Sequence, residues 1–241
     1  MIDLHCHILP GVDDGARSLA DSLAMARQAE QDGIRVVCAT PHIRHDHDVA
    51  IAELSERVAD LNDAIARAGI DVRVLTGGEV GESAALELDD GELDLVSLGG
   101  GGRWILLEPA PGPLSDALER VVAELARRGR RCIIAHPERH LDGDSAERLA
   151  ALVRAGALLQ GTAAHLLGPG APALHDLAAA GLLHVLASDA HSARAGRPLR
   201  ISPGLEALRA GGTLTAHLDW ITRTAPAAVV AGRDVDPPFH P

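Results

Sequence analysis

Two short motifs carry the most obvious chemistry in this chain, H-C-H at residues 5–7 and D-A-H at residues 189–191. Residues two apart in an extended strand face the same side, so each motif can present both polar side chains to one ion or to two neighbouring ions. The same alternation turns Cys6 the opposite way, where we expect a small buried apolar residue. The motifs therefore predict imidazole and carboxylate ligands without sulfur, a set that suits Mn, Fe, Co or Zn.

Ligand-type side chains recur where other apolar runs end. Any one of them alone is explained more simply as a loop residue or a helix cap. Together they predict a metal site with several ions, with Glu108 as the bridging carboxylate because it is central in chain order. The predicted ligands are His5, His7, His42, Glu79, Glu108, His136, Asp189 and His191. The remaining histidines are interpreted as structural or surface residues: His45, His47, His140, His165, His175, His184, His217 and His240.

The elements that must position these residues alternate along the chain. Strands are predicted at 2–6, 35–40, 72–76, 103–107, 131–135, 157–161 and 183–187. Helices are predicted from Ser18 to Gly33, and at 50–68, 82–88, 114–128, 144–155, 171–180, 203–210 and 214–231. This alternation predicts a parallel α/β sheet, either barrelled or doubly wound, in a single domain over residues 1–241. In a barrel, all the candidate ligands lie on the face formed by the C-terminal ends of the strands.

Cations held by neutral imidazoles favour an anionic substrate, and phosphate fits best. A metal-bridging hydroxide formed near neutral pH could attack phosphorus in line. Arg139 follows His136 closely enough for its planar fork to hold a phosphoryl oxygen. Arg194 and Arg197 are alternatives for a second such contact beyond His191.

Composition narrows the function classes further. The net charge of -12 opposes binding to nucleic acid or to an anionic membrane, and no segment is apolar enough for membrane insertion. All 22 basic residues are arginines, which excludes phosphate-loop lysines, Schiff-base catalysis and carbamylated-lysine metal bridges. Three cysteines form no disulfide framework, so we expect a cytoplasmic protein.

The motifs together resemble the polymerase-and-histidinol-phosphatase (PHP) superfamily. The resemblance rests on D-L-H-C-H-I-L-P-G-V-D-D-G-A, A-T-P-H, G-G-E-V, L-L-E-P-A, A-H-P-E-R and A-S-D-A-H-S, in that order from residue 2 to about residue 200. More narrowly, the chain is similar to the bacterial tyrosine-protein phosphatases of capsule and exopolysaccharide synthesis. This resemblance implies a distorted (β/α)7 barrel and two or three divalent ions, usually manganese, on the same eight ligands.

The resemblance also implies roles outside the ligand set. Arg139 and Arg197 match phosphate-binding arginines, although Arg194 competes with Arg197, and Asp14 matches a family position for which we expect a role in orienting a ligand. The expected function is a metal-dependent phosphomonoesterase that dephosphorylates a bacterial tyrosine kinase without a phosphocysteine intermediate. A small-molecule phosphatase acting on histidinol phosphate or a sugar phosphate is the alternative enzyme. A non-catalytic, metal-stabilised regulator that docks on a kinase is the alternative outside enzymes.

Overall fold

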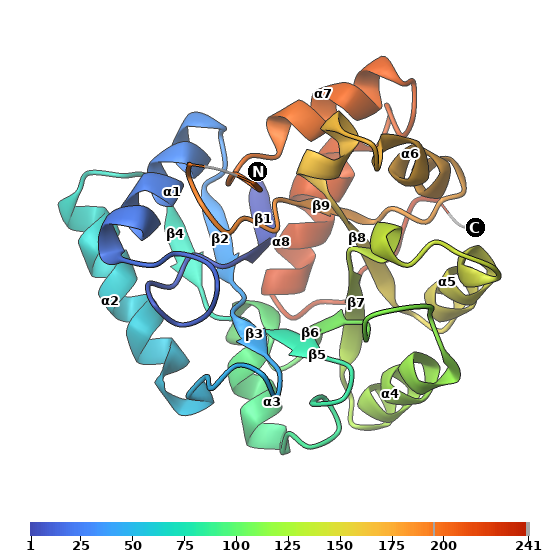
Figure 1. Ribbon diagram of the computed structural model, residues 1–241, viewed down its shortest axis with the longest axis horizontal. Coiled ribbons are helices and arrows are strands. Elements are labelled where there is room, and N and C mark those ends of the chain that lie inside the picture. The colour runs from blue at the N-terminus through green and yellow to red at the C-terminus, as the bar shows by residue number, and fades with distance from the viewer. Residues whose placement is uncertain (195, 240–241) are drawn as a thin grey trace.

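The computed structural model describes residues 1–194 and 196–239, in which strands and helices alternate. The strands lie in the middle and helices α1 to α7 surround them (Figure 1). The strands are β1 (Ile2–Cys6), β2 (Val36–Ala39), β3 (His42–Ile43), β4 (Arg73–Leu75), β5 (Glu79–Gly81), β6 (Trp104–Glu108), β7 (Arg131–Ala135), β8 (Leu158–Thr162) and β9 (Val185–Ala187). The α-helices are α1 (Leu19–Gln31), α2 (Leu54–Arg67), α3 (Asp90–Val96), α4 (Asp116–Arg127), α5 (Ser145–Arg154), α6 (Ala171–Ala179), α7 (Ser202–Ala210) and α8 (Ala225–Val230).

The strands form two parallel sheets, in the orders β1-β2-β4 and β3-β5-β6-β7-β8-β9. The predicted parallel α/β architecture is therefore confirmed. The ladder is not one continuous barrel, because β2 stops before Pro41, which has no backbone N–H to donate, and β3 begins beyond it. An isolated bridge between Cys6 and Ala190 joins the two sheets on the other side.

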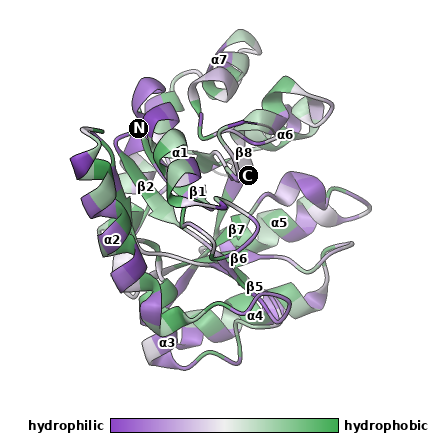
Figure 2. Ribbon diagram, turned by 60° about the vertical axis from the view of Figure 1, so that its left-hand side comes forward, coloured by the Kyte–Doolittle hydropathy of each residue, from purple (hydrophilic) through white to green (hydrophobic). Residues whose placement is uncertain are grey.

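Local sequence explains how the helices begin and end. The Ser18 side chain accepts a hydrogen bond from the Asp21 backbone N–H and caps α1, and Gly33 beyond the helix adopts a positive φ of 79°. In α2 the residues Leu54, Val58 and Leu61 form a buried stripe at helical spacing. Figure 2 shows the result, with hydrophobic and hydrophilic residues interleaved along the outer helices.

One helix prediction was wrong, and another placed the start of its helix too early. Residues 82–88 form turns, and the helix in this region is α3, where Asp89 and Glu92 make a reciprocal capping box. The last helical region also begins later than residue 214, since Leu214 has a positive φ of 53° that a helix excludes. The π-helical turn Trp220–Thr224 (η5) then leads into α8.

Alternation along the central strands separates two apolar clusters and sets the direction of the polar residues. On β6, Ile105 and Leu107 belong to the larger cluster, whereas Trp104 and Leu106 belong to a smaller one that includes Val229 of α8. Glu108 follows in the same alternation as Trp104 and Leu106. The Glu108 carboxylate thus lies on the same face of the sheet as the smaller cluster, at the C-terminal end of β6.

Candidate metal centre

Six of the predicted ligands lie near or just beyond the C-terminal ends of β1, β6, β7 and β9, whereas His42 and Glu79 are the first residues of β3 and β5. Parallel pairing brings them together. His42 pairs with Glu79 across β3 and β5, and Gly81 pairs with Glu108 across β5 and β6. His136 follows β7, and Asp189 follows β9 beside β1. The eight residues, with Asp14, fall into overlapping groups whose possible ligand atoms lie within 4.8 Å of one another.

Glu79 is the centre of this cluster. Its Oε2 lies 3.3 Å from Nε2 of both His5 and His7 and 3.0 Å from Nδ1 of His42. Its Oε1 lies 2.9 Å from Nε2 of His136. Glu108 is peripheral, with its Oε2 3.8 Å from Nδ1 of His42. Glu79, and not Glu108, is therefore the carboxylate at the centre of the cluster, because centrality in chain order does not give centrality in space. The bridging role of Glu108 stays a prediction.

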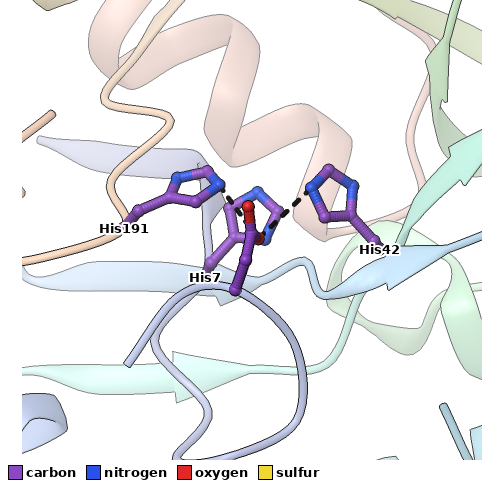
Figure 3. A group of neighbouring side chains, drawn as sticks. His7, His42 and His191 are labelled. Carbon is purple, nitrogen blue, oxygen red and sulfur yellow. Dashed lines mark ion pairs between the residues drawn. The ribbon is translucent and has the colours of Figure 1, made fainter. Parts of the chain in front are cut away.

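A second group lies on the outer side of His7. Figure 3 shows the His7, His42 and His191 rings gathered together, with ion pairs from His42 and His191. The shared partner is Asp14, whose Oδ1 lies 3.5 Å from Nε2 of His42 and 3.3 Å from Nε2 of His191. The Asp14 side chain is 58% exposed. Asp14 therefore faces Nε2 of both rings, and its role in orienting a ligand stays a prediction.

Two other residues hold the ring orientations. Oδ2 of Asp13 lies 2.6 Å from Nδ1 of His7 and also accepts a hydrogen bond from the His42 backbone N–H. Oε1 of Gln160 lies 2.8 Å from Nδ1 of His5. Both contacts leave Nε2 of the histidine directed at the cluster, which is how outer partners fix a ligating tautomer. Sequence reasoning missed Gln160, although a polar residue inside an apolar strand was a signal.

Arginines converge on Asp189. Nη2 of Arg139 and Nη1 of Arg197 both donate to its Oδ2, and Nη2 of Arg197 lies 3.1 Å from Nε2 of His191. Arg194 instead has a side chain that is 82% exposed, and its nearest acid is Asp21 at 3.6 Å. The structure thus favours Arg197 over Arg194 as the second arginine at the centre.

Backbone strain is concentrated in the same place. Of the non-glycine residues with positive φ in the described part of the chain, His136 has a φ of 34° and Asp189 a φ of 50°. Such conformations are costly for residues with a Cβ and are typical of functional sites. With this backbone, Nε2 of His136 lies 2.9 Å from Oε1 of Glu79, and Oδ1 of Asp189 lies 3.4 Å from Nε2 of His5.

The electrostatics of the cluster favour ionised carboxylates. Burial would raise the pKa of Glu79, but the charge of His5 and the hydrogen bond of His136 hold that pKa well below its usual range. Burial would also raise the pKa of Asp189, which His5 and Arg197 nevertheless lower to about 2. Burial and the charges of His7 and Arg197 lower the pKa of His191 to about 4, so its imidazole is neutral near pH 7.

These residues fit divalent cations. Nδ1 of His42, Oε2 of Glu79 and Nδ1 of His136 are buried and form no hydrogen bond with the described residues, although the first two atoms lie only 3.0 Å apart as an ion pair. Buried polar atoms are rarely left in this state, and a cation would satisfy the lone pairs of the nitrogen and oxygen donors. A pocket of about 660 Å³ beside Asp14 and His191 gives access from one side.

The histidines outside the predicted set mostly make other contacts. His45 is exposed beside Glu87, His140 contacts the Gly112 carbonyl, and His165 pairs with Glu138. The His47 ring lies 4.8 Å from the His42 ring and pairs with Asp46. These residues, with His175, His184 and His217, belong to none of the candidate ligand groups among the described residues, and His240 lies outside those residues.

Comparison with known proteins identifies the family. The family model described as capsular polysaccharide synthesis, CpsB/CapC, matches residues 1–212. The chain belongs to the CpsB/CapC family. This membership confirms the resemblance to the bacterial tyrosine-protein phosphatase branch, since its curated members carry that name.

Individual members of the CpsB/CapC family are similar over most of their length. The tyrosine-protein phosphatase YwqE of Bacillus subtilis is 37% identical over 202 residues, which cover 80% of this chain and 78% of YwqE. CapC of Staphylococcus aureus is 28% identical over 200 residues, covering 80% and 77% of the two chains. A solved structure from a study of YwqE and of CpsB from Streptococcus pneumoniae, described there as metal-dependent tyrosine phosphatases, superposes with a TM-score of 0.88 at 32% identity, over 100% of this chain and 99% of the other.

Two further observations concern the chain outside the centre. None of the helices in the described residues has the length and hydropathy needed to cross a membrane. Cys6, Cys38 and Cys132 are buried and unpaired. Cys6 belongs to the large apolar cluster, as the alternation in the H-C-H motif predicted.

Proposed function

We propose that the protein is a metal-dependent protein-tyrosine phosphatase whose substrate is a bacterial tyrosine kinase of capsule or exopolysaccharide synthesis. The observation that carries this proposal is the position of Arg139 and Arg197, which meet on Asp189 at the edge of the histidine cluster around Glu79. A phosphoryl group at this edge would contact guanidinium groups on one side and cation-binding side chains on the other. Family membership and the names of the relatives support the same activity.

We assign two or three divalent cations to the cluster, with manganese favoured over iron, cobalt or zinc. The proposed ligands are His5, His7, His42, Glu79, Glu108, His136, Asp189 and His191, with Asp14 as a further candidate. Bound cations would supply the Lewis acidity that activates an attacking water and neutralises charge on the phosphoryl oxygens.

The protein's own residues prepare and orient the reaction. Asp13 and Gln160 hold His7 and His5, while Arg139 and Arg197 align the phosphoryl group and stabilise the charge that develops on it. A tyrosinate leaving group, with a pKa of about 10, needs less protonation than an alkoxide. A cysteine nucleophile is disfavoured, because burial raises the pKa of the Cys132 thiol to about 12 and also raises the pKa values of Cys6 and Cys38.

The proposal extends to architecture and location. If β2 with β3 and β4 with β5 are each one interrupted strand, the two sheets form a distorted (β/α)7 barrel whose last contact is the bridge from Cys6 to Ala190. One apolar cluster that reaches from Cys6 to Ile221 supports a single domain. The unpaired cysteines support a reducing cytoplasmic setting.

The decisive experiment compares wild type with His136→Ala. Metal content is measured in the purified proteins, and turnover is measured with Mn²⁺ on a phosphotyrosine peptide and on histidinol phosphate. We expect wild type to prefer the peptide, and the substitution to abolish turnover while circular dichroism shows an intact fold. Preference for histidinol phosphate would support a small-molecule phosphatase instead. A fully metal-loaded protein that hydrolyses no aryl phosphate would support a non-catalytic regulator.

A further inference from the structure

Arg44 contacts the candidate centre at a point that the proposed mechanism does not use. It follows β3 directly, and its Nη1 donates a 2.8 Å hydrogen bond to Oε2 of Glu108. Its other edge is held by Asp46, since Nε donates to Oδ1 at 3.0 Å and Nη2 to Oδ2 at 2.7 Å. The Arg44 guanidinium is therefore fixed between the exposed carboxylate of Asp46 and the carboxylate of Glu108 in the candidate centre.

The neighbouring strand leaves space for this side chain. Gly81 on β5 faces Arg44, and a Cβ built on Gly81 would lie 2.9 Å from Cγ and 3.2 Å from Cδ of Arg44. Gly81 lies within a regular strand and does not have a positive φ, so its backbone does not demand glycine. The missing side chain instead provides the gap that the Arg44 stem fills.

The charges of the pair suit a role beside a cation. The Asp46 carboxylate compensates the Arg44 guanidinium, so the pair adds little net repulsion to a cation bound at Glu108. A carboxylate offers about four lone-pair directions, of which Arg44 occupies one on Oε2. Glu108 forms a candidate ligand group with His42 and Glu79, so the Arg44 hydrogen bond still leaves lone pairs with which Glu108 could bind a cation.

We propose that Arg44 is a positioning residue that holds the Glu108 carboxylate in its cation-binding orientation. Asp46 fixes the other edge of the Arg44 guanidinium, and Gly81 leaves space for the Arg44 side chain. This inference rests on the proposed role of Glu108 as a ligand. Without Arg44, the Glu108 side chain, which is 13% exposed, could rotate toward solvent. A freely rotating carboxylate would lose rotamer entropy on binding a cation, so its affinity would fall.

The test titrates Mn²⁺ into chelator-treated protein by isothermal titration calorimetry, so the readout is binding and not turnover. The variants are Glu108→Gln, Arg44→Gln, Gly81→Ala and the double variant Arg44→Gln/Glu108→Gln. The matched control is Arg57→Ala, which removes an exposed arginine whose partner is Glu53 on the preceding turn. Circular dichroism and thermal unfolding establish that each variant is folded.

We expect Arg44→Gln to weaken Mn²⁺ binding at one site by about 10- to 100-fold, the usual effect of losing an outer partner of a ligand. Glu108→Gln should weaken binding at that site at least as much, because it removes a charged ligand. Gly81→Ala should reproduce the Arg44→Gln effect, because the new methyl group displaces the Arg44 stem. The double variant should bind no more weakly than Glu108→Gln, because Arg44 acts through Glu108. Arg57→Ala should bind as wild type does.

The outcomes separate this inference from the proposed function. Wild-type affinity in Glu108→Gln would refute the ligand role of Glu108 and with it this inference, but not the proposed function, which rests on Arg139, Arg197 and the cluster around Glu79. Weak binding in Glu108→Gln together with wild-type affinity in Arg44→Gln would overturn only the positioning role. Additive losses in the double variant would also overturn it, since Arg44 would then act by another route.

Discussion

Replacing Gly15 by alanine is predicted to disable the centre without touching a candidate ligand. A Cβ on Gly15 would lie 2.2 Å from the His7 carbonyl oxygen and 2.4 Å from the His7 Cβ. Ordinary contacts begin near 3.4 Å, so the two segments must separate by about 1 Å. The His7 side cannot yield easily, because the clashing atoms include the backbone carbonyl group of His7, just beyond β1.

The separation acts on the contact that orients His7. The Gly15 N–H donates to Oδ1 of Asp13, whose Oδ2 lies 2.6 Å from Nδ1 of His7, and the Ala16 N–H donates to the His7 carbonyl. A retreat of about 1 Å lengthens the Asp13 contact beyond hydrogen-bonding range. We expect a loss of about 100-fold in kcat/KM, and of about 1–3 kcal/mol in the free energy of unfolding from overpacking.

The assay measures kcat/KM on a phosphotyrosine peptide at saturating Mn²⁺, with urea unfolding of the same samples. Gly168→Ala is the matched control, since a Cβ there meets no atom within 4 Å and the backbone is extended. We expect the control to behave as wild type does. Activity within twofold of wild type in Gly15→Ala would refute the reasoning, because it would mean that the loop can move without loss of the His7 orientation.

Three other predictions concern the centre itself. Arg197→Ala should lower kcat/KM by about 100- to 1,000-fold. Arg194 is exposed, so Arg194→Ala should change kcat/KM little. Equal effects of the two substitutions would contradict the assignment of Arg197 as the second arginine. Cys6→Ala should keep bound metal and turnover, whereas His5→Ala should lose both, as measured by elemental analysis and peptide assay. Chelator treatment should lower the melting temperature of the protein. Mn²⁺ at 100 times its Kd should then raise the free energy of unfolding by about 2.7 kcal/mol. A melting temperature that does not change with Mn²⁺ would argue against a cation at Glu79.

The sequence was most informative where strand periodicity decides direction. Alternation predicted that His5 and His7 share a face and that Cys6 does not, because a strand repeats every two residues whatever surrounds it. The convergence of ligand-type residues was predictable because parallel strands place their C-terminal ends together. The short strands β3 and β5, which begin at His42 and Glu79, were not predicted. The role of each residue as a metal ligand remains a prediction.

The remainder depends on contacts that periodicity does not encode. The chain order of Glu79 and Glu108 contains no information on which carboxylate lies among four histidines. Asp13 and Asp14 are adjacent, and only the turn held by Gly15 decides which of them reaches Nδ1 of His7. The α3 helix was predictable from the Asp89 and Glu92 capping box, whereas the apolar residues at 82–88 gave a misleading helical pattern.

The junction between β1 and β9 has a consequence for biosynthesis. Asp3 accepts hydrogen bonds from Ser188, 185 positions further along the chain, and the His5 carbonyl accepts one from the Asp189 N–H. A ribosome therefore releases His5 and His7 long before Asp189 and His191 exist. A nascent chain that stops short of residue 189 lacks Asp189 and His191, so it cannot yet assemble the proposed cation centre.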